Sequence, residues 1–241
     1  MSINKQIFIS GASRGIGKAI AELFASQGYD LHLTCQHNID VLQREAKKLE
    51  ETYATRISCY QIDMSDSHTL AQFMKTLPPL DVVINNVGIS HIGLLTDLSI
   101  EEWNLILQTN LTSSFVVCRN VLPSMIGRQA GKIINISSVW GLQGASMEVC
   151  YSTTKGALNS FTKALAKEMA PSNIQINAIA CGLINTDMNR CFSEEELLDV
   201  IDQIPANRIG EAFEVADLCL QLVNAPTYLT GQIISLDGGW I

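Results

Sequence analysis

Tyr151 and Lys155 are two side chains of this sequence that could together move a proton. They stand four residues apart in a segment with helical periodicity, so they share one face of a helix. An ammonium group beside a phenol favours the phenolate, which predicts a tyrosine pKa below its usual value of about 10. Ser138, at the end of a predicted strand, can hold a carbonyl oxygen nearby. A lone Tyr-x-x-x-Lys is common on helix surfaces, so the other motifs decide its meaning.

Three glycines, Gly11, Gly15 and Gly17, lie between the first predicted strand and the first predicted helix. Glycines permit a tight turn and a close backbone approach to a ligand, and a helix N-terminus attracts a pyrophosphate. The spacing differs from the G-x-G-x-x-G of long-chain dehydrogenases. We interpret the stretch as a phosphate-binding loop, with a purely structural turn as the alternative.

The same stretch overlaps two other motifs. A P-loop requires four residues between its glycine and the Gly-Lys pair, whereas five residues separate Gly11 from Gly17. Ser13 stands in a G-x-S-x-G pattern, which is typical of a hydrolase nucleophile. A hydrolase also needs a later histidine as its base, and the last histidine is His91. A Ser13 hydrolase is therefore a minor alternative.

The end of the second predicted strand predicts the choice of cofactor. An acid at this position binds the 2′-hydroxyl of an adenosine ribose and repels a 2′-phosphate, but the chain has Cys35 and Gln36 there. Arg14 could pair with a 2′-phosphate as a charged donor. These residues predict NADP(H) over NAD(H), unless Arg14 is simply a solvated loop residue.

Asn110 falls on the apolar stripe of a long predicted helix. A buried amide needs hydrogen-bond partners. It is either a core asparagine satisfied by the backbone, or one that holds water or bends the helix beside an active site, and the spacing does not decide between them.

These residues must be positioned by short apolar strands that alternate with helix-period segments. Strict alternation predicts a parallel α/β sheet with helices on both faces, and without a linker or repeat we expect one domain over 1–241. The predicted strands cover 7–9, 31–34, 57–62, 82–84, 133–136, 174–179 and 233–236. The predicted helices cover 15–27, 39–54, 66–76, 99–126, 149–170, 194–203 and 211–223.

Composition excludes several classes of protein. With 47% hydrophobic and 17% charged residues the chain is not disordered, and a net charge of −8 leaves no basic surface for nucleic acid. No apolar run reaches the ~18 residues of a membrane helix, and no secretory signal is visible, so we expect a cytoplasmic protein. The seven cysteines, of which Cys181 and Cys191 are the closest pair, are expected to be free thiols, and no metal site is expected.

In combination these motifs resemble the short-chain dehydrogenase/reductase family, over essentially the whole chain. The resemblance implies a Rossmann-type, doubly wound sheet of seven parallel strands that binds NADP(H). The motifs that carry it are Gly11/Gly15/Gly17, Asp63-Met64, Asn85-Asn86-Val87-Gly88, Asn110, Ser138, Tyr151-x-x-x-Lys155 and Leu236-Asp237-Gly238-Gly239.

The resemblance also implies roles for individual residues. Tyr151 would be the general acid/base, Lys155 would lower its pKa and bind the nicotinamide ribose, Ser138 would orient the carbonyl, and Asn110 would hold a proton-relay water. A sensor without catalysis would not need this set, so an enzyme is favoured. The implied cofactor-binding residues are Gly11, Ser13, Arg14, Gly15, Ile16, Gly17, Gln36, Asp63, Met64, Asn86, Gly88, Tyr151, Lys155, Gly182, Ile184 and Thr186. Two departures are Val87 for the family's usual alanine and Cys181 for its usual proline.

Within the family, Thr186-Asp187-Met188 and the run 204–210 are similar to 3-oxoacyl-[acyl carrier protein] reductases. Those enzymes bind an acidic carrier protein through basic residues near the mouth of the active site. Arg128 and Lys132 could serve here, although Ser172 stands at a second basic position.

A different substrate is suggested by Trp140 and Glu148, which flank Tyr151 and should face the substrate pocket. An acid there suits a cationic substrate. The run Ser-Ser-Val-Trp-Gly at 137–141, with Glu148 three residues before Tyr151, resembles reductases of the 5-aminopentanone group on elongation factor P. Alternatively, Glu148 only favours the helix start through the dipole.

The resemblance further implies a homotetramer built on the two long helices and the last strand. The predicted helix 99–126 is apolar over more than one face, and the large apolar residues Trp240 and Ile241 follow that strand. Exposed apolar patches often mark interfaces, although these residues could instead cover the core.

Overall fold

Seven strands pair in one parallel sheet, in the order β3-β2-β1-β4-β5-β6-β7. This order confirms the doubly wound parallel sheet predicted from the sequence. The computed structural model describes residues 4–189 and 193–241, so Cys191 lies outside the described residues. The strands are β1 (Gln6–Ile9), β2 (Asp30–Cys35), β3 (Ile57–Gln61), β4 (Val82–Asn85), β5 (Gly131–Ser138), β6 (Ile174–Cys181) and β7 (Ile233–Leu236).

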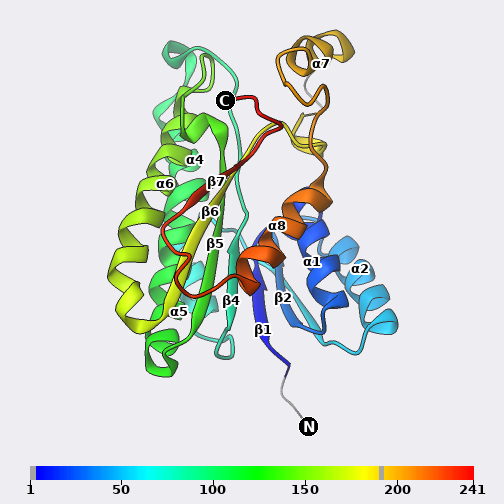
Figure 1. Ribbon diagram of the computed structural model, residues 1–241, viewed down its shortest axis with the longest axis vertical. Coiled ribbons are helices and arrows are strands. Elements are labelled where there is room, and N and C mark those ends of the chain that lie inside the picture. The colour runs from blue at the N-terminus through cyan, green and yellow to red at the C-terminus, as the bar shows by residue number, and fades with distance from the viewer. Residues whose placement is uncertain (1–3, 190–192) are drawn as a thin grey trace.

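Helices cover both faces of the sheet, and one further helix lies beyond its carboxyl edge (Figure 1). The first face carries α1 (Gly15–Ser26), α2 (Ile39–Thr52) and α8 (Ala212–Asn224). The second carries α3 (Ser67–Met74), α4 (Ile100–Leu107), α5 (Ser113–Arg128) and α6 (Val149–Met169). The helix beyond the edge is α7 (Glu194–Ile201).

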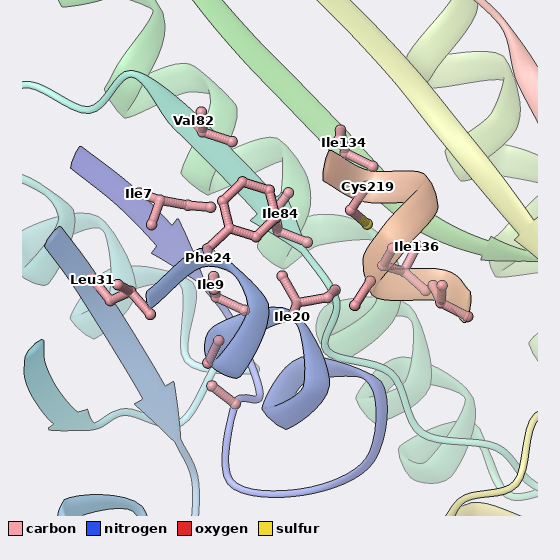
Figure 2. Close-up of a cluster of buried hydrophobic side chains, with 14 of the residues drawn as sticks. Ile7, Ile9, Ile20, Phe24, Leu31, Val82, Ile84, Ile134, Ile136 and Cys219 are labelled. Carbon is pink, nitrogen blue, oxygen red and sulfur yellow. The ribbon is translucent and has the colours of Figure 1, made fainter. Parts of the chain in front are cut away.

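Alternation along the central strands divides the core into two layers. Ile7 and Ile9 of β1 pack against α1 and α8, whereas Phe8 between them joins the layer under α3 and α5. Figure 2 shows the first layer, in which Phe24 and Ile20 of α1 lie against the strands. Burying each such side chain contributes about 1.5–3 kcal/mol, so the carboxyl ends of the strands are held on a rigid base.

The predicted helix 99–126 is not continuous. A π-helical turn, Gln108–Thr112, separates α4 from α5 and contains Asn110. Such turns are rare and occur often at functional sites.

The described cysteines and helices bear on two further expectations. Six cysteines are free thiols, as predicted, and five of the six are buried. Over 4–189 and 193–241, no helix is both long and apolar enough to cross a membrane.

Candidate active site

A cleft of about 860 Å³ opens at the carboxyl ends of the strands, beside the point where β1 and β4 lead to opposite halves of the sheet. Ligands of open parallel sheets bind at this position. The structure brings all but two of the predicted site residues to its walls. The two exceptions, Gly17 and Asn110, lie behind the wall.

The glycine loop forms the first wall of the cleft. Gly11 and Gly15 have φ angles of +68° and +54°, a region that favours glycine. A Cβ on Gly17 would lie 2.2 Å from the Gly11 carbonyl oxygen, so α1 can approach the loop only with glycine there. Arg14 is the N-cap of α1 and makes no side-chain cap, which leaves the first-turn N–H groups for an external acceptor.

Asn86 fixes this loop to the end of β4. Its Nδ2 donates to the carbonyl oxygens of Ser10 and Gly11 at 3.0 and 3.1 Å, and its backbone N–H donates to Ser10 Oγ at 2.9 Å. Sequence reasoning missed Ser10, because a single serine at a strand end carries no spacing pattern.

The far end of this wall carries Asp63, Gln36 and Arg14. Partial burial raises the pKa of the Asp63 carboxyl, but hydrogen bonds from Ser65 and Gln36 outweigh it and leave the pKa below its usual value. Arg14 Nη1 lies 3.8 Å from Asp187 Oδ2, so this arginine faces an acid on the opposite wall. Cys35 and Gln36 line the cleft at the end of β2, so no carboxylate stands at these two positions.

Ser138, Tyr151 and Lys155 meet at the centre of the cleft. Ser138 ends β5 and is hydrogen-bonded to Tyr151 in the first turn of α6. Lys155 Nζ donates to the Ile136 carbonyl oxygen at 2.9 Å and lies 5.5 Å from the centroid of the Tyr151 ring. A Cβ on Gly88 would lie 3.2 Å from that Nζ, so glycine keeps the space beside the buried ammonium open.

The protonation of this centre corrects an expectation. Burial, followed by the nearby Cys181, raises the pKa of Tyr151 by more than the Ser138 hydrogen bond lowers it. The pKa of Tyr151 is therefore raised and not lowered as predicted, because desolvation outweighs the contacts that favour the phenolate. Burial also lowers the pKa of Lys155 itself, to about 8.

Asn110 is fully buried in the π-helical turn. Its Oδ1 accepts from the Ile89 N–H at 2.8 Å, and its Nδ2 donates to the Ile89 carbonyl at 2.8 Å and to Thr154 Oγ1 at 3.1 Å. Thr154 Oγ1 in turn donates to the carbonyl oxygen of Tyr151 at 2.8 Å. Both readings of Asn110 therefore hold in part, because it is a satisfied core amide placed at a break in the helix.

Glu148 lies at the end of the cleft opposite the glycine loop. It is the N-cap residue of α6, yet its side chain makes no cap. Instead Ser90 Oγ donates to Glu148 Oε2 at 2.8 Å, and both residues line the cleft. The reading of Glu148 as only a helix-start residue therefore lacks its expected contact. Ser90 was not predicted, since no motif marks it.

Arg128 and Lys132 are not near the mouth of the cleft. The helix α5 runs back to the amino edge of the sheet, so its last residue and the start of β5 lie at the opposite end of the strands. Arg128 Nη1 donates to Asp81 Oδ1 at 2.8 Å, beside a second cavity of about 730 Å³, and Lys132 Nζ donates to the Ala225 carbonyl at 2.9 Å. The prediction that Arg128 and Lys132 lie near the mouth of the active site is therefore wrong for the cleft of their own chain.

Comparison with known proteins agrees with this geometry. A family model described as short chain dehydrogenase matches residues 5–197. "Uncharacterized oxidoreductase YmfI" of Bacillus subtilis is 39% identical over 240 residues, covering 99% of each chain. The 3-oxoacyl-[acyl-carrier-protein] reductase FabG of Chlamydia trachomatis is 36% identical over 242 residues, covering 98% of this chain and 97% of its own.

Solved structures share the whole architecture. A Beutenbergia cavernae structure, described as an NAD(P) dependent gluconate 5-dehydrogenase with bound NADP, superimposes with a TM-score of 0.94 at 26% identity. The match covers 99% of this chain and 98% of that one.

Proposed function

Because the chain belongs to the short-chain dehydrogenase family, we propose that it reduces a ketone to a secondary alcohol with NADPH, as a single domain over 1–241. The observation that carries this proposal is the meeting of Ser138, Tyr151 and Lys155 at the centre of the cleft. Bound NADPH supplies the hydride that adds to the carbonyl carbon.

The residues of the cleft supply the proton and hold the reactants. Tyr151 donates its hydroxyl proton to the carbonyl oxygen, and its raised pKa keeps that proton in place at neutral pH. Ser138 donates a hydrogen bond to the same oxygen and so fixes the carbonyl beside Tyr151. The ammonium of Lys155 stabilises the phenolate that remains after proton transfer. Asn110 holds α6 to the loop after β4 and so keeps Tyr151 in place.

We propose that the cofactor binds at the end of the cleft formed by the glycine loop. The free N–H groups at the start of α1 suit a pyrophosphate, and the open space at Gly88 gives a ribose access to Lys155. Asp63, Met64, Gly182, Ile184 and Thr186 all line the cleft. We assign Asp63 and Met64 to the adenine, and Gly182, Ile184 and Thr186 to the nicotinamide. Arg14 and the missing acid at Cys35 favour NADPH over NADH.

The first candidate substrate is a 3-oxoacyl chain on acyl carrier protein. The names of relatives such as the Chlamydia trachomatis enzyme support it. The position of Arg128 and Lys132 weakens it, because within one chain neither residue can guide an acidic carrier to the cleft.

The second candidate is a ketone that carries an amine, such as the 5-aminopentanone group on elongation factor P. The contact of Glu148 with Ser90 favours it, since this contact holds a carboxylate in the wall of the cleft. Opposite charges about 4 Å apart attract by about 4 kcal/mol at an effective dielectric of 20, before desolvation. Desolvation and screening remove most of that, so we expect about tenfold discrimination.

The test measures NADPH oxidation with an amino ketone and with an acetoacetyl thioester, in the wild type and in Glu148→Gln. A selective loss of efficiency on the amino ketone supports the second candidate. An equal change on both substrates favours the acyl carrier candidate. No oxidation with any ketone would overturn the proposed function, and substrate cleavage without NADPH consumption would indicate a Ser13 hydrolase.

We also propose that the chain forms a homotetramer. Ile100 of α4 and Phe115 of α5 are 74% and 46% exposed, and exposed apolar side chains often lie in interfaces. A monomer in light scattering at micromolar concentration would contradict the proposal.

A further inference from the structure

Two tryptophans that are far apart in the sequence form an aromatic wall in the cleft. Trp140 follows Ser138 in the turn Val139–Gly141, and Trp240 follows β7. Their ring centroids are 4.8 Å apart, with the ring planes inclined by 60°. Both rings line the cleft, and each is only half-buried, so part of each ring is accessible to a ligand.

The backbone around Asp237 holds Trp240 in place. The Asp237 carboxylate accepts from the N–H groups of Gly239 and Ile241 at 3.0 and 3.2 Å, and the Trp240 N–H donates to the Asp237 carbonyl at 3.3 Å. A Cβ on Gly182 would lie 2.8 Å from the Asp237 Cα, so β6 and this turn pack in direct backbone contact. Trp240 is therefore fixed relative to the catalytic strands.

The same turn is attached to the segment that follows α7. The Ala206 N–H donates to the Gly238 carbonyl at 3.1 Å, and a Cβ on Gly238 would lie 2.8 Å from Ile204 Cγ2. Val200 at the end of α7 and Gln203 at the start of that segment also line the cleft. Trp240 thus joins two walls of what we call the substrate end, formed by Ser90, Ile92, Leu105, Trp140, Met147, Glu148, Met188, Val200, Gln203 and Trp240.

Glu148 is the one charged residue among those that form the substrate end, and its charge is negative. Among the described lining residues, the acids other than Glu148 are Asp63 and Asp187, which lie with the cofactor residues, and Asp187 faces Arg14. Of the lining cations, Lys155 donates to the Ile136 carbonyl and Arg14 faces Asp187. A substrate group at this end of the cleft therefore meets the exposed parts of the two packed indoles and one carboxylate.

We propose that Trp240 is a specificity-determining residue, and that with Trp140 and Glu148 it forms a subsite for an alkylammonium group of the ketone. Indole faces attract cations through their ring quadrupole, and an alkylammonium presents both charge and methylene surface to them. The inference rests on the proposed ketone reduction. It adds a binding group that Glu148 alone does not provide.

The test compares two ketones of the same shape. One carries a trimethylammonium group three methylenes from the carbonyl, and the other has a tert-butyl group in its place. We expect Trp240→Leu to raise the KM for the cationic ketone about fivefold to tenfold, with kcat nearly unchanged, and to change the KM for the neutral ketone less than about twofold. Trp240→Phe should retain most of the preference, and Trp103→Phe, on α4 and outside the cleft, should change neither value.

Fluorinated tryptophan gives a second measurement that does not depend on the leucine variant folding. Incorporated in the Trp103→Phe background, it weakens the quadrupole of Trp140 and Trp240 while keeping their shape. The preference for the cationic ketone should then fall. Equal changes for both ketones, or none, would overturn the inference.

The two proposals fail in different ways. If the wild type reduces neither of these ketones, nor the amino ketone or the acetoacetyl thioester, the proposed function fails. The subsite is then judged by calorimetric binding of the trimethylammonium alcohol, with the tert-butyl alcohol as the control. Equal affinity for the two alcohols would overturn the inference.

Discussion

At the cofactor end of the cleft the contacts that hold the walls together involve backbone atoms, whereas at the substrate end they join one side chain to another. Gly17 and Gly11 touch without any side chain between them, and Asn86 binds backbone carbonyls. The substrate end depends on the pairs Ser90–Glu148 and Trp140–Trp240, which come from four separate segments. The cofactor end binds the cofactor, which every substrate of this site must use. At the substrate end, single substitutions can change which substrate is accepted.

The largest effect should come from the centre, which both ends serve. We expect Tyr151→Phe to lower kcat for ketone reduction by about 10²–10⁴-fold, because it removes the proton donor. NADPH binding, measured by fluorescence titration, should change little. Ser13→Ala is the control and should retain most turnover. If Ser13→Ala abolishes activity and Tyr151→Phe does not, the site is assigned wrongly.

Lys155 should make stability depend on pH in the chain without cofactor. Its folded pKa of about 8 lies below the usual lysine pKa of 10.5, so between these values the unfolded chain binds more protons. The penalty for burying the ammonium is therefore complete below pH 8 and is relieved as the pH rises. Relative to Lys155→Met, the free energy of unfolding of the wild type should rise by about 2–3 kcal/mol from pH 7 to pH 10. A difference that stays constant in urea denaturation would contradict this.

A substitution at the cofactor end should be destabilising even though it adds one methyl group. In Gly17→Ala the new Cβ meets the Gly11 carbonyl oxygen, so we expect a loss of about 1–3 kcal/mol in stability together with weaker NADPH binding. Gly127→Ala in α5 is the matched control, since its Cβ meets nothing within 4 Å. The control should be neutral or stabilise the helix by up to about 1 kcal/mol. Equal effects in thermal unfolding would refute the contrast.

The smallest effect concerns the adenosine position. Cys35→Asp places an acid where a 2′-phosphate would bind, so the ratio of kcat/KM for NADPH over NADH should fall about tenfold. Kinetics with both cofactors measure this ratio. A wild type that already prefers NADH would show that Arg14 does not select the phosphate.

The cofactor end was predictable from sequence because its contacts follow strand ends and glycine spacing. The substrate end was predicted only in part. Trp140 and Glu148 are near Tyr151 in the chain, but Ser90 and Trp240 reach them only through the fold. Trp240 was interpreted as an interface or core residue because its partner lies 100 positions earlier.

Other misses have equally specific causes. The residues of the turn Gln108–Thr112 include no glycine or proline, so the sequence does not mark the break in the helix. The direction in which the pKa of Tyr151 moves depends on burial, which spacing within one helix does not reveal. The place of Arg128 depends on which edge of the sheet α5 reaches.

Transfer of deuterium tests the central claim most directly. The chain is incubated with NADPH that carries deuterium at the transferable position of the nicotinamide, together with the trimethylammonium ketone or the acetoacetyl thioester, and the alcohol is analysed by mass spectrometry and NMR. We predict one deuterium on the carbinol carbon, and about 10²–10⁴-fold slower formation of this labelled alcohol with Tyr151→Phe. An alcohol without deuterium, or NADPH that binds but is not consumed with any ketone, would contradict the assignment of this cleft as a carbonyl-reducing site.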